Sequence, residues 1–202
     1  MLIKICGITN AEDALLCGSL GADFLGFIFY SKSKRYISSE IAKEIIAKLS
    51  PEVKKVGVFV NEEFDEVNRI AGELNLDYVQ LHGEETPEYC GMIHANKIKA
   101  FRVVDGFDFS VIEKYNNCIP LMDTYSSIEY GGTGKAFDWE IIPVEIKNRC
   151  FLSGGISVDN VLDAKHKVNP YAVDLSSSLE LFPGKKDLTK VTKFFEIIKK
   201  SS

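Results

Sequence analysis

Two side chains, Cys6 and Asp123, combine reactive chemistry with a position at the end of an apolar run of residues. Asp123 follows the apolar run 119–122, where a carboxyl group is costly unless it is paired or used in a reaction. Cys6 ends a short apolar run before Gly7, and cysteine is also a frequent filler of protein cores. From its position alone, a functional and a structural role are equally open for Cys6. A thiol and a carboxyl group at one site could act as general base and general acid.

The other four cysteines are predicted to be structural. Cys17 and Cys90 lie in predicted helices, whereas Cys118 and Cys150 begin or precede predicted strands. The total of five cysteines is odd and no C-x-x-C motif is present, which argues against a disulfide framework and against a zinc site. Reduced thiols of this kind are typical of a cytoplasmic protein. With only three histidines and no H-x-x-x-H motif, we expect no metal site.

Two segments rich in serine and glycine predict a phosphate site. Gly154 and Gly155 lack a Cβ atom, so their backbone N–H groups can approach an anion closely. Ser176 and Ser177 offer hydroxyl groups and could open a short helix whose start favours negative charge. Two ordinary turns are the alternative interpretation. The placement of these segments after the last two predicted strands favours phosphate binding.

A third glycine-rich segment, 131–135, contains Gly132 and invites comparison with a nucleotide-binding loop. The Walker A pattern is not met, because Glu129 stands where its first glycine is required and Ala136 replaces its Ser or Thr. The whole connection Tyr125–Phe137 is long for a link between a strand and a helix. We therefore predict that it is a flexible lid over the active site.

The elements that must position these residues alternate along the chain. Short apolar runs, typical of parallel strands covered on both faces, are separated by longer amphipathic stretches. The predicted strands are Leu2–Ile8, Ala22–Tyr30, Lys54–Val60, Tyr78–Gly83, Lys97–Val103, Ile119–Tyr125, Arg149–Gly154 and Ala172–Ser176. The predicted helices are Ala11–Leu20, Ser39–Leu49, Phe64–Leu74, Pro87–Ile93, Phe109–Tyr115, Trp139–Ile142, Val158–Lys167 and Leu188–Lys200.

Eight strands and eight helices in strict alternation predict a single-domain α/β protein, a (β/α)8 TIM barrel over residues 1–202. An open doubly wound sheet is the alternative, because alternation alone also allows it. In a barrel the active site lies at the carboxyl ends of the strands. Cys6 and Asp123 are predicted at such ends, together with Arg35 after the second strand and Gln80 and His82 on the fourth.

Composition narrows the classes of partner. Apolar residues make up 46% of the chain and charged residues 26%, which are globular proportions. The net charge of −5 argues against a broad surface that binds nucleic acid. The chain has no apolar run near the length of a membrane span, and its start leads into a strand rather than a signal peptide. We expect a small phosphorylated molecule as the partner, no nucleic acid, no membrane, and a monomer, with a dimer as the alternative.

Taken together and in order, the motifs resemble the phosphoribosylanthranilate isomerase family of tryptophan biosynthesis. Matching segments occur in seven of the eight predicted strand–helix units. They are residues 4–9, 26–29 with 31–37, 56–61, 79–83, 123–124, 130–135 with 137–139, 152–155, and 174–177 with Glu180 and 183–187. One departure is Ser178, where the family usually has glycine, and this difference concerns the phosphate site.

The resemblance implies an Amadori rearrangement of N-(5-phosphoribosyl)anthranilate to 1-(2-carboxyphenylamino)-1-deoxyribulose 5-phosphate, without a cofactor. It implies that Asp123 is the general acid for the furanose ring oxygen and Cys6 the general base that takes the C2 proton. It also implies that Arg35 holds the anthranilate carboxylate. A basic thiol needs positive charge nearby, and Lys4 shares its strand face. The predicted substrate-binding residues are Arg35, Gln80, His82, Gly132, Gly154, Gly155, Ser176 and Ser177.

Several alternatives stay open. The ribonucleotide isomerase of histidine biosynthesis is understood to use two aspartates, and Cys6 stands where the first would be. Indole-glycerol-phosphate synthase usually carries an N-terminal extension, whereas this chain begins at its first predicted strand. A non-catalytic phosphosugar-binding barrel could keep the anion site and dispense with Cys6 or Asp123. Cys6 could also act as a covalent nucleophile.

Overall fold

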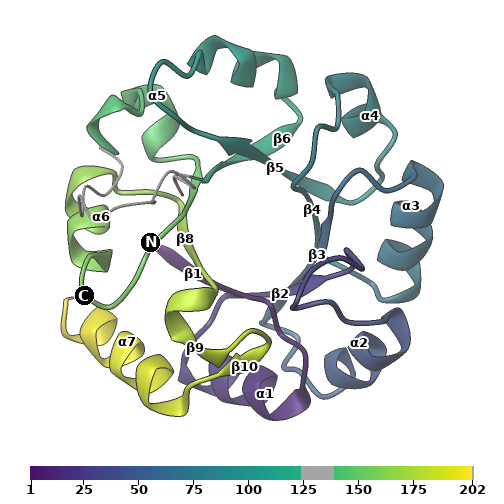
Figure 1. Ribbon diagram of the computed structural model, residues 1–202, viewed down its shortest axis with the longest axis vertical. Helices are drawn as coiled ribbons and strands as arrows, with labels where there is room; N and C mark the ends of the chain where they lie inside the picture. The colour runs from purple at the N-terminus through teal and green to yellow at the C-terminus, as the bar shows by residue number, and fades with distance from the viewer. Residues whose placement is uncertain (124–138, 202) are drawn as a thin grey trace.

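The strands form a closed barrel in a computed structural model that describes residues 1–123 and 139–201. Within these residues, eight parallel strands pair in the order β1 to β8, and β8 pairs with β1 to close the ring. Figure 1 shows the ring with the helices outside it. The strands are β1 (Leu2–Cys6), β2 (Phe24–Ile28), β3 (Lys54–Phe59), β4 (Tyr78–Leu81), β5 (Asn96–Arg102), β6 (Cys118–Asp123), β7 (Phe151–Ser153) and β8 (Ala172–Leu175). The predicted (β/α)8 barrel is confirmed, and the open sheet is excluded.

The connections between strands are mostly helical. Side chains of Asn10, Ser38 and Thr86 accept a backbone N–H at the starts of three of them, as expected for helix caps. The α-helices are α1 (Ala11–Leu20), α2 (Ser39–Ile46), α3 (Phe64–Glu73), α4 (Pro87–Gly91), α5 (Val144–Lys147), α6 (Val161–Lys167) and α7 (Leu188–Lys200). The 3-10 helices are η1 (Phe109–Tyr115), η2 (Trp139–Ile141) and η3 (Ser177–Leu179).

Most strands are shorter than the apolar runs that predict them. The first run extends to Ile8, but β1 ends at Cys6 and Ile8 is nevertheless fully buried. Ile8 is apolar because it belongs to the core between strands and helices, although it lies beyond the end of β1. An apolar run in the sequence therefore indicates which residues are buried. Where a strand ends depends on its hydrogen bonds to the neighbouring strands.

Aromatic and aliphatic side chains fill the barrel toward the amino ends of its strands. Phe24 packs edge-to-face against Tyr78 and Phe151, with ring centroids 5.6 and 5.3 Å apart. This small interior cluster is separate from the larger core between strands and helices. The apolar cluster fills the barrel at the amino ends of the strands. The buried polar residues of the interior, such as Lys4 and Lys99, lie nearer the carboxyl ends.

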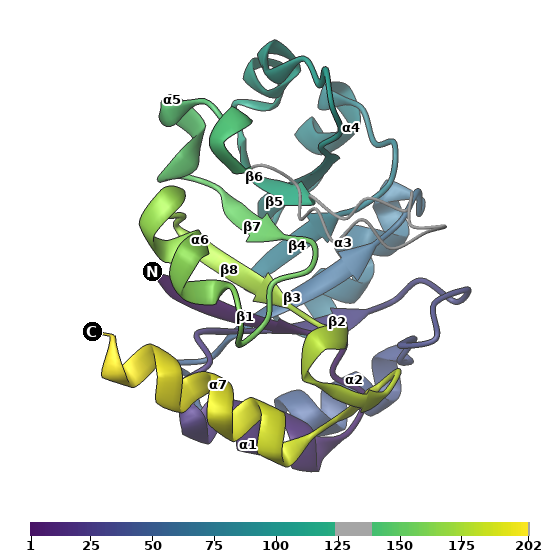
Figure 2. The same ribbon diagram turned by 60° about the vertical axis from the view of Figure 1, so that its left-hand side comes forward.

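A hairpin follows β8 and was not predicted from the sequence. It consists of β9 (Glu180–Phe182) and β10 (Lys185–Lys186), paired antiparallel, and it leads into α7. Figure 2 shows the hairpin beside the end of β8, with α7 running alongside α1. The short helix α5 was also missed. No helix in the described part of the chain is long and apolar enough to cross a membrane.

Candidate active site

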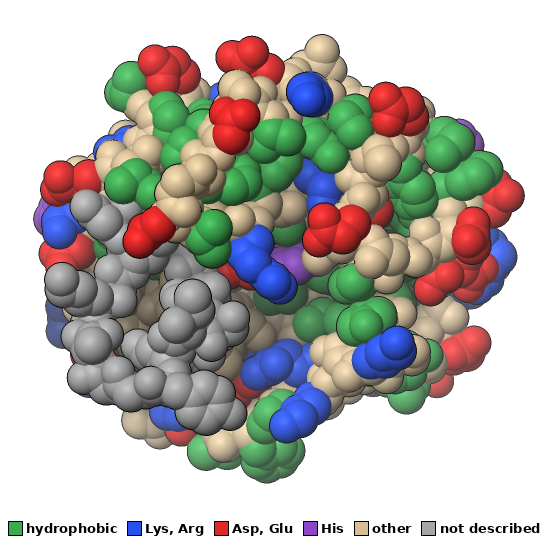
Figure 3. Space-filling view, turned by 45° about the horizontal axis from the view of Figure 1, so that its top comes forward, with side chains coloured by type: hydrophobic (Ala, Val, Ile, Leu, Met, Phe, Trp, Pro, Cys, Tyr) green, Lys and Arg blue, Asp and Glu red, His purple; other side chains and the backbone are tan. Residues whose placement is uncertain are grey.

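A cavity opens at the carboxyl ends of the strands. Its volume is about 230 Å³, and Figure 3 shows basic side chains and a histidine around the hollow in this face of the molecule. Five of the predicted site residues line it: Cys6, Arg35, Gln80, His82 and Ser176. Other lining residues include Tyr30, Ser33, Val58, Val60 and Asp174.

Cys6 is placed by the close approach of β1 and β2. It is the last residue of β1, as predicted, and it pairs in register with Gly26 of β2. A Cβ atom at Gly26 would lie 2.7 Å from the Cys6 sulfur, which is far below an ordinary contact. Glycine at position 26 therefore makes the room that the Cys6 thiol occupies. Only 7% of Cys6 is exposed, and that part faces the cavity.

Charged groups surround the Cys6 thiol without turning it into a ready thiolate. Burial raises the pKa of Cys6, and the negative charge of Asp174 adds to this effect. Lys4 lowers the pKa of Cys6 through its charge and a hydrogen bond, and Lys186 lowers it through its charge, but the net shift is upward. The sequence-based requirement for positive charge near the sulfur is met, yet burial outweighs it in the protein without substrate.

Lys4 and Asp174 form a buried ion pair beside Cys6. The Lys4 ammonium donates to Asp174 Oδ2 at 2.8 Å, and the Lys4 side chain is fully buried. The two residues lie opposite each other in register on β1 and β8. Asp174 Oδ1 is buried and has no hydrogen-bond partner within the described residues, although Asp174 lines the cavity. A substrate hydroxyl group could donate to this oxygen.

Gln80, His82 and Asp123 form a polar chain across β4 and β6. The Gln80 amide nitrogen lies 2.8 Å from His82 Nδ1, and His82 Nε2 lies 3.3 Å from Asp123 Oδ2. The His82 imidazole therefore lies between the Gln80 amide group and the Asp123 carboxyl group, within hydrogen-bond distance of both. Gln80 Oε1 is buried without a partner in the described part of the chain. The structure thus brings these three predicted residues together.

A second cavity lies on the other side of the same histidine. It has a volume of about 300 Å³, and His82, Lys99, Phe101, Tyr115 and Asp123 are among the residues that line it. His82 and Asp123 border this space, while His82 also borders the first cavity. The Asp123 carboxyl group is therefore connected to the Cys6 side of the barrel through His82.

Arg35 reaches the first cavity from the loop after β2, and Glu180 of β9 holds its guanidinium group. Arg35 Nε donates to both carboxylate oxygens at 2.9 and 3.1 Å, and Nη2 donates to Oε2 at 2.6 Å. This hydrogen bonding raises the pKa of Arg35. Gly7 allows the approach, since it has a φ of 79° and a Cβ atom there would lie 2.7 Å from Arg35 Cδ.

The segments predicted to bind phosphate lie after β7 and β8. Gly154 and Gly155 both have left-handed φ values, 86° and 73°, which turn the backbone sharply after β7. The hydroxyl groups of Ser176 and Ser178 are buried and have no partner among the described residues, whereas Ser177 is exposed. A short helix does follow β8, as expected, but it is a 3-10 turn of three residues. Gly132 and the predicted lid Tyr125–Phe137 lie outside the described residues.

The remaining cysteines lie away from this site. Cys17, Cys90, Cys118 and Cys150 are buried in or beside α1, α4, β6 and β7, where the sequence placed them. No group of three or more metal-ligating His, Cys, Asp or Glu side chains occurs among the described residues.

Comparison with known proteins identifies the family. The profile of the N-(5'-phosphoribosyl)anthranilate isomerase family matches residues 3–197. The chain belongs to this family. A curated N-(5'-phosphoribosyl)anthranilate isomerase from Geobacter sp. strain M21 is 49% identical over 201 residues, covering 99% of this chain and 98% of the relative. The expectation of an isomerase is thus confirmed.

Solved structures of phosphoribosylanthranilate isomerases have the same fold as this chain. The crystal structure of the enzyme from Thermotoga maritima superposes with a TM-score of 0.90 at 46% identity, covering 99% of both chains. Another crystal structure, 43% identical with a TM-score of 0.88 and 99% of both chains covered, is a complex with reduced 1-(o-carboxyphenylamino)-1-deoxyribulose 5-phosphate.

The sequence did not identify Glu180 and Lys186 as parts of the site, whereas Asp174, on the eighth predicted strand, was expected to be structural or orienting. Glu180 and Lys186 belong to segments that carry the family resemblance, but no role followed from their spacing. The signal that marks them is their burial: the side chains of Glu180 and Lys186 are 3% and 0% exposed. A buried charge is costly unless it is paired, and burial cannot be read from a short polar segment.

Proposed function

We propose that this chain catalyses the Amadori rearrangement of N-(5'-phosphoribosyl)anthranilate to 1-(2-carboxyphenylamino)-1-deoxyribulose 5-phosphate. The observation that carries the proposal is the shared mouth of the barrel. Cys6, Arg35 and Ser176 line one cavity there with His82, whose imidazole contacts Asp123. Asp123 lines the neighbouring cavity, so a substrate that extends from one cavity to the other would reach the base, the acid and two anion-binding groups.

Asp123 acts as the general acid. It protonates the furanose ring oxygen, and cleavage of the C1–O bond then gives a ring-opened Schiff base. His82 Nε2 lies 3.3 Å from Asp123 Oδ2, so the imidazole can donate a hydrogen bond to the anion that remains after proton transfer. Arg35 presents a fork of donors to the anthranilate carboxylate, and the turn 154–155 and the Ser176 and Ser177 hydroxyl groups bind the phosphate.

Cys6 acts as the general base. Its thiolate takes the proton from C2 of the Schiff base, which gives an enolamine, and tautomerisation of the enolamine yields the ketone. The raised pKa of Cys6 means that only a small fraction is thiolate in the substrate-free protein at neutral pH. That fraction is correspondingly strong as a base. Lys4 and Lys186 supply the positive charge that opposes the effect of burial.

The reaction as proposed is an intramolecular oxidoreduction of the aldose–ketose type that uses acid–base groups alone. It needs no cofactor and no metal ion, since the proton moves only between substrate atoms and side chains. We also propose that residues 1–202 act as one domain, in the cytoplasm, on a small phosphorylated substrate and not on nucleic acid or a membrane.

A turnover assay with freshly prepared N-(5'-phosphoribosyl)anthranilate tests this function. We expect turnover without added cofactor or metal. Cys6→Ala and Asp123→Ala should each lower kcat by about 10²- to 10⁴-fold with smaller effects on KM, because each removes a proton-transfer group. Cys17→Ala is the matched control, because Cys17 is buried in α1 and does not line the cavity.

Two results would contradict the assignments. A wild-type kcat in Cys6→Ala would remove Cys6 as the base. A stable covalent adduct between substrate and the Cys6 sulfur, detected by mass spectrometry, would favour the alternative in which Cys6 is a nucleophile.

A further inference from the structure

A fully buried lysine lies directly beneath the proposed site. Lys186 of β10 directs its ammonium group to three acceptors: the Cys6 carbonyl oxygen at 2.7 Å, the Ser176 carbonyl oxygen at 3.3 Å and Glu180 Oε1 at 3.1 Å. An ammonium group has three donors, so each can be used here. Lys186 thus joins the end of β1 to the first residue after β8, the two places where the proposed base and phosphate-binding hydroxyls lie.

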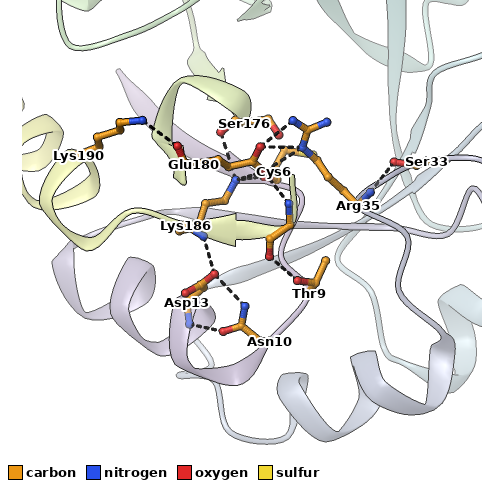
Figure 4. A network of polar contacts seen from close by, with 11 residues as sticks. Cys6, Thr9, Asn10, Asp13, Ser33, Arg35, Ser176, Glu180, Lys186 and Lys190 are labelled. Atoms are coloured by element: carbon orange, nitrogen blue, oxygen red, sulfur yellow. Dashed lines mark hydrogen bonds and ion pairs between the residues drawn. The ribbon is translucent and has the colours of Figure 1, made fainter. Parts of the chain in front are cut away.

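Glu180 connects the same lysine to Arg35. Its carboxylate accepts the forked hydrogen bonds of Arg35, one from Lys186, and one from the backbone N–H of Gly184 at 3.3 Å. Figure 4 shows Arg35 and Lys186 reaching Glu180 from different sides. Burial alone would raise the pKa of Glu180, but Arg35 and Lys186 together lower it, so the carboxyl group is ionised. We call Arg35, Glu180 and Lys186 the clamp.

The hairpin that carries Glu180 and Lys186 is anchored by other contacts. Asp13 of α1 accepts the backbone N–H of Lys186 and the ammonium group of Lys185, both at 2.7 Å. Thr9 donates to the Gly184 carbonyl oxygen, and Lys190 donates to the Glu180 carbonyl oxygen at 2.7 Å. Since these bonds hold the hairpin backbone, the Lys186 ammonium group is not required for that purpose.

Its burial therefore needs another explanation. Two buried charges cost desolvation free energy, and apolar residues of similar volume often stabilise a protein as well or better. A buried pair that is retained at the edge of a reactive cavity is well suited to fix geometry, because its bonds are directional.

We propose that Lys186 and Glu180 are positioning residues: Lys186 sets Cys6 against the phosphate-binding end of β8, and Glu180 sets the guanidinium group of Arg35 toward the substrate carboxylate. This proposal rests on the proposed function, since it concerns the same site. Neither residue lines the cavity, so both act through the groups that they hold.

The pH at which Cys6 forms a thiolate depends on the charges near it, and this pH can be measured without substrate. The charged groups that face Cys6 are Lys4 on β1, Arg35 after β2, Asp174 on β8 and Lys186 on β10. Lys186→Met removes one of the positive charges that lower the pKa of Cys6, whereas burial and Asp174 continue to raise it. The thiolate of Cys6 should then form only at a higher pH than in the wild type.

The experiment compares Lys186→Met and Glu180→Gln with the control Lys185→Met. Lys185 neighbours Lys186 on β10 and is also ion-paired, with Glu12 and Asp13, but it does not contact the clamp. For each variant we would measure kcat, KM, the melting temperature, and the pH profile of Cys6 alkylation by iodoacetamide, located by peptide mass spectrometry.

We expect distinct changes. Lys186→Met should lower kcat by about 10- to 100-fold, because a displacement of about 1 Å at a reacting group has effects of that size. It should also move the Cys6 alkylation profile to higher pH. Glu180→Gln should raise KM by about tenfold, because Arg35 loses a charge-assisted partner that orients it. Lys185→Met should leave kcat, KM and the alkylation profile as in the wild type.

Three outcomes would overturn the proposal. The first is a lower melting temperature in Lys186→Met with kcat and the alkylation profile unchanged, which would mean a purely structural pair. The second is an equal loss of activity in Lys185→Met, which would assign the effect to the hairpin as a whole. The third is an unchanged or lowered KM in Glu180→Gln.

The test separates this proposal from the proposed function. If the wild type shows no turnover, the proposed function fails, and alkylation alone decides about Lys186. A shift in Lys186→Met but not in Lys185→Met then supports its effect on Cys6, and no shift overturns it. If Lys186→Met does not fold, Glu180→Gln decides through KM.

Discussion

At the scale of single residues, the site depends on how closely two backbones approach. The Cys6 thiol occupies the space that a side chain at position 26 would need, and the Gly7 turn leaves room for the stem of Arg35. Because Gly7 and Gly26 have no side chains, the thiol and the guanidinium group can share one small cavity. The chemistry of Cys6 then depends on the balance between burial and the charges of Lys4, Asp174 and Lys186.

The first prediction at this scale concerns the pH dependence of Cys6. Because its pKa is raised, the thiol form dominates at neutral pH, and the thiolate fraction grows as the pH rises toward that pKa. The rate of Cys6 alkylation in the substrate-free protein should rise with pH, with a midpoint above the ordinary cysteine value of about 8.5. If the proposed mechanism holds, kcat/KM should instead follow a bell-shaped pH profile, because the reaction needs Cys6 as thiolate and Asp123 in its acid form at the same time. A midpoint below that ordinary value would mean that the lysines outweigh burial.

The second residue-scale prediction concerns Gly26. Gly26→Ala places a Cβ atom 2.7 Å from the Cys6 sulfur, so either the sulfur or one of the two strands must shift. We expect a loss of stability of about 1–3 kcal/mol, typical of overpacking, together with a lower kcat. Chemical denaturation and turnover measure the two effects.

The matching control is Gly26→Ala in a Cys6→Ala background. Without the sulfur, most of the clash is relieved, so the loss of stability should be smaller than in the wild-type background. An equal loss in both backgrounds would show that the backbone of β1, rather than the thiol, needs the glycine.

At the scale of elements, short loops at the barrel mouth are fixed by buried charges from neighbouring strands. Glu85, after β4, accepts the backbone N–H groups of Gly83 at 2.9 Å and Asn61 at 2.9 Å. Lys99 of β5 donates to Glu85 Oε2 at 3.0 Å and to the Gly83 carbonyl oxygen at 2.6 Å. The Glu85–Lys99 pair thus ties the loop that begins with His82 to β5 and to the loop after β3.

This pair gives the element-scale prediction. Lys99→Met leaves the Glu85 carboxylate buried without its cationic partner, so we expect a loss of about 3–5 kcal/mol in the free energy of unfolding. The loop that carries His82 should loosen as well, which amide hydrogen exchange of residues 82–86 would detect as faster exchange. Lys97→Met is the control on the same strand, because Lys97 donates to the carbonyl oxygens of Ile93 and Ala95 and not to Glu85. Equal effects of the two substitutions would contradict a specific role for the pair.

At the scale of the whole molecule, closure of the barrel decides which residues meet. β8 pairs with β1, so Asp174 comes opposite Lys4, although the two lie 170 positions apart in the chain. The hairpin β9–β10 then passes the closure point and brings Lys186 to the Cys6 carbonyl group. Closure also pairs the outermost strands with each other, which leaves the eight-stranded sheet without an exposed edge.

The prediction at this scale is that the chain is a monomer in solution. The main exposed apolar side chains of the hairpin are Leu181 and Phe182, with 63% and 62% of their surface exposed. Two side chains are few for an interface, since a stable one buries about 1,200–2,000 Å² in total. Sedimentation equilibrium over a wide range of protein concentration should give the mass of one chain. If a dimer forms instead, Phe182→Ser would test whether the hairpin is the contact, since it should restore the monomer.

The sequence by itself determined the alternation of strands and helices, from which the barrel is predicted, and it supplied most of the candidate site residues. Alternating apolar runs and capped helices predict the order of elements, because local burial and helix capping depend on nearby residues. The same logic places Cys6 and Asp123 at strand ends, where the structure has them. The exact strand ends were not determined, because residues such as Ile8 are apolar through burial in the core although they lie beyond the end of a strand.

Only the tertiary structure decided how these residues are held. The Lys4–Asp174 pair, the clamp of Arg35, Glu180 and Lys186, and the space that Gly26 leaves for Cys6 all join segments far apart in the chain. Such contacts follow from strand register and barrel closure, which no local pattern encodes. The net rise of the Cys6 pKa has the same origin, since burial is a property of the folded molecule. The sequence supplied the reactive groups, and the closed fold set their surroundings.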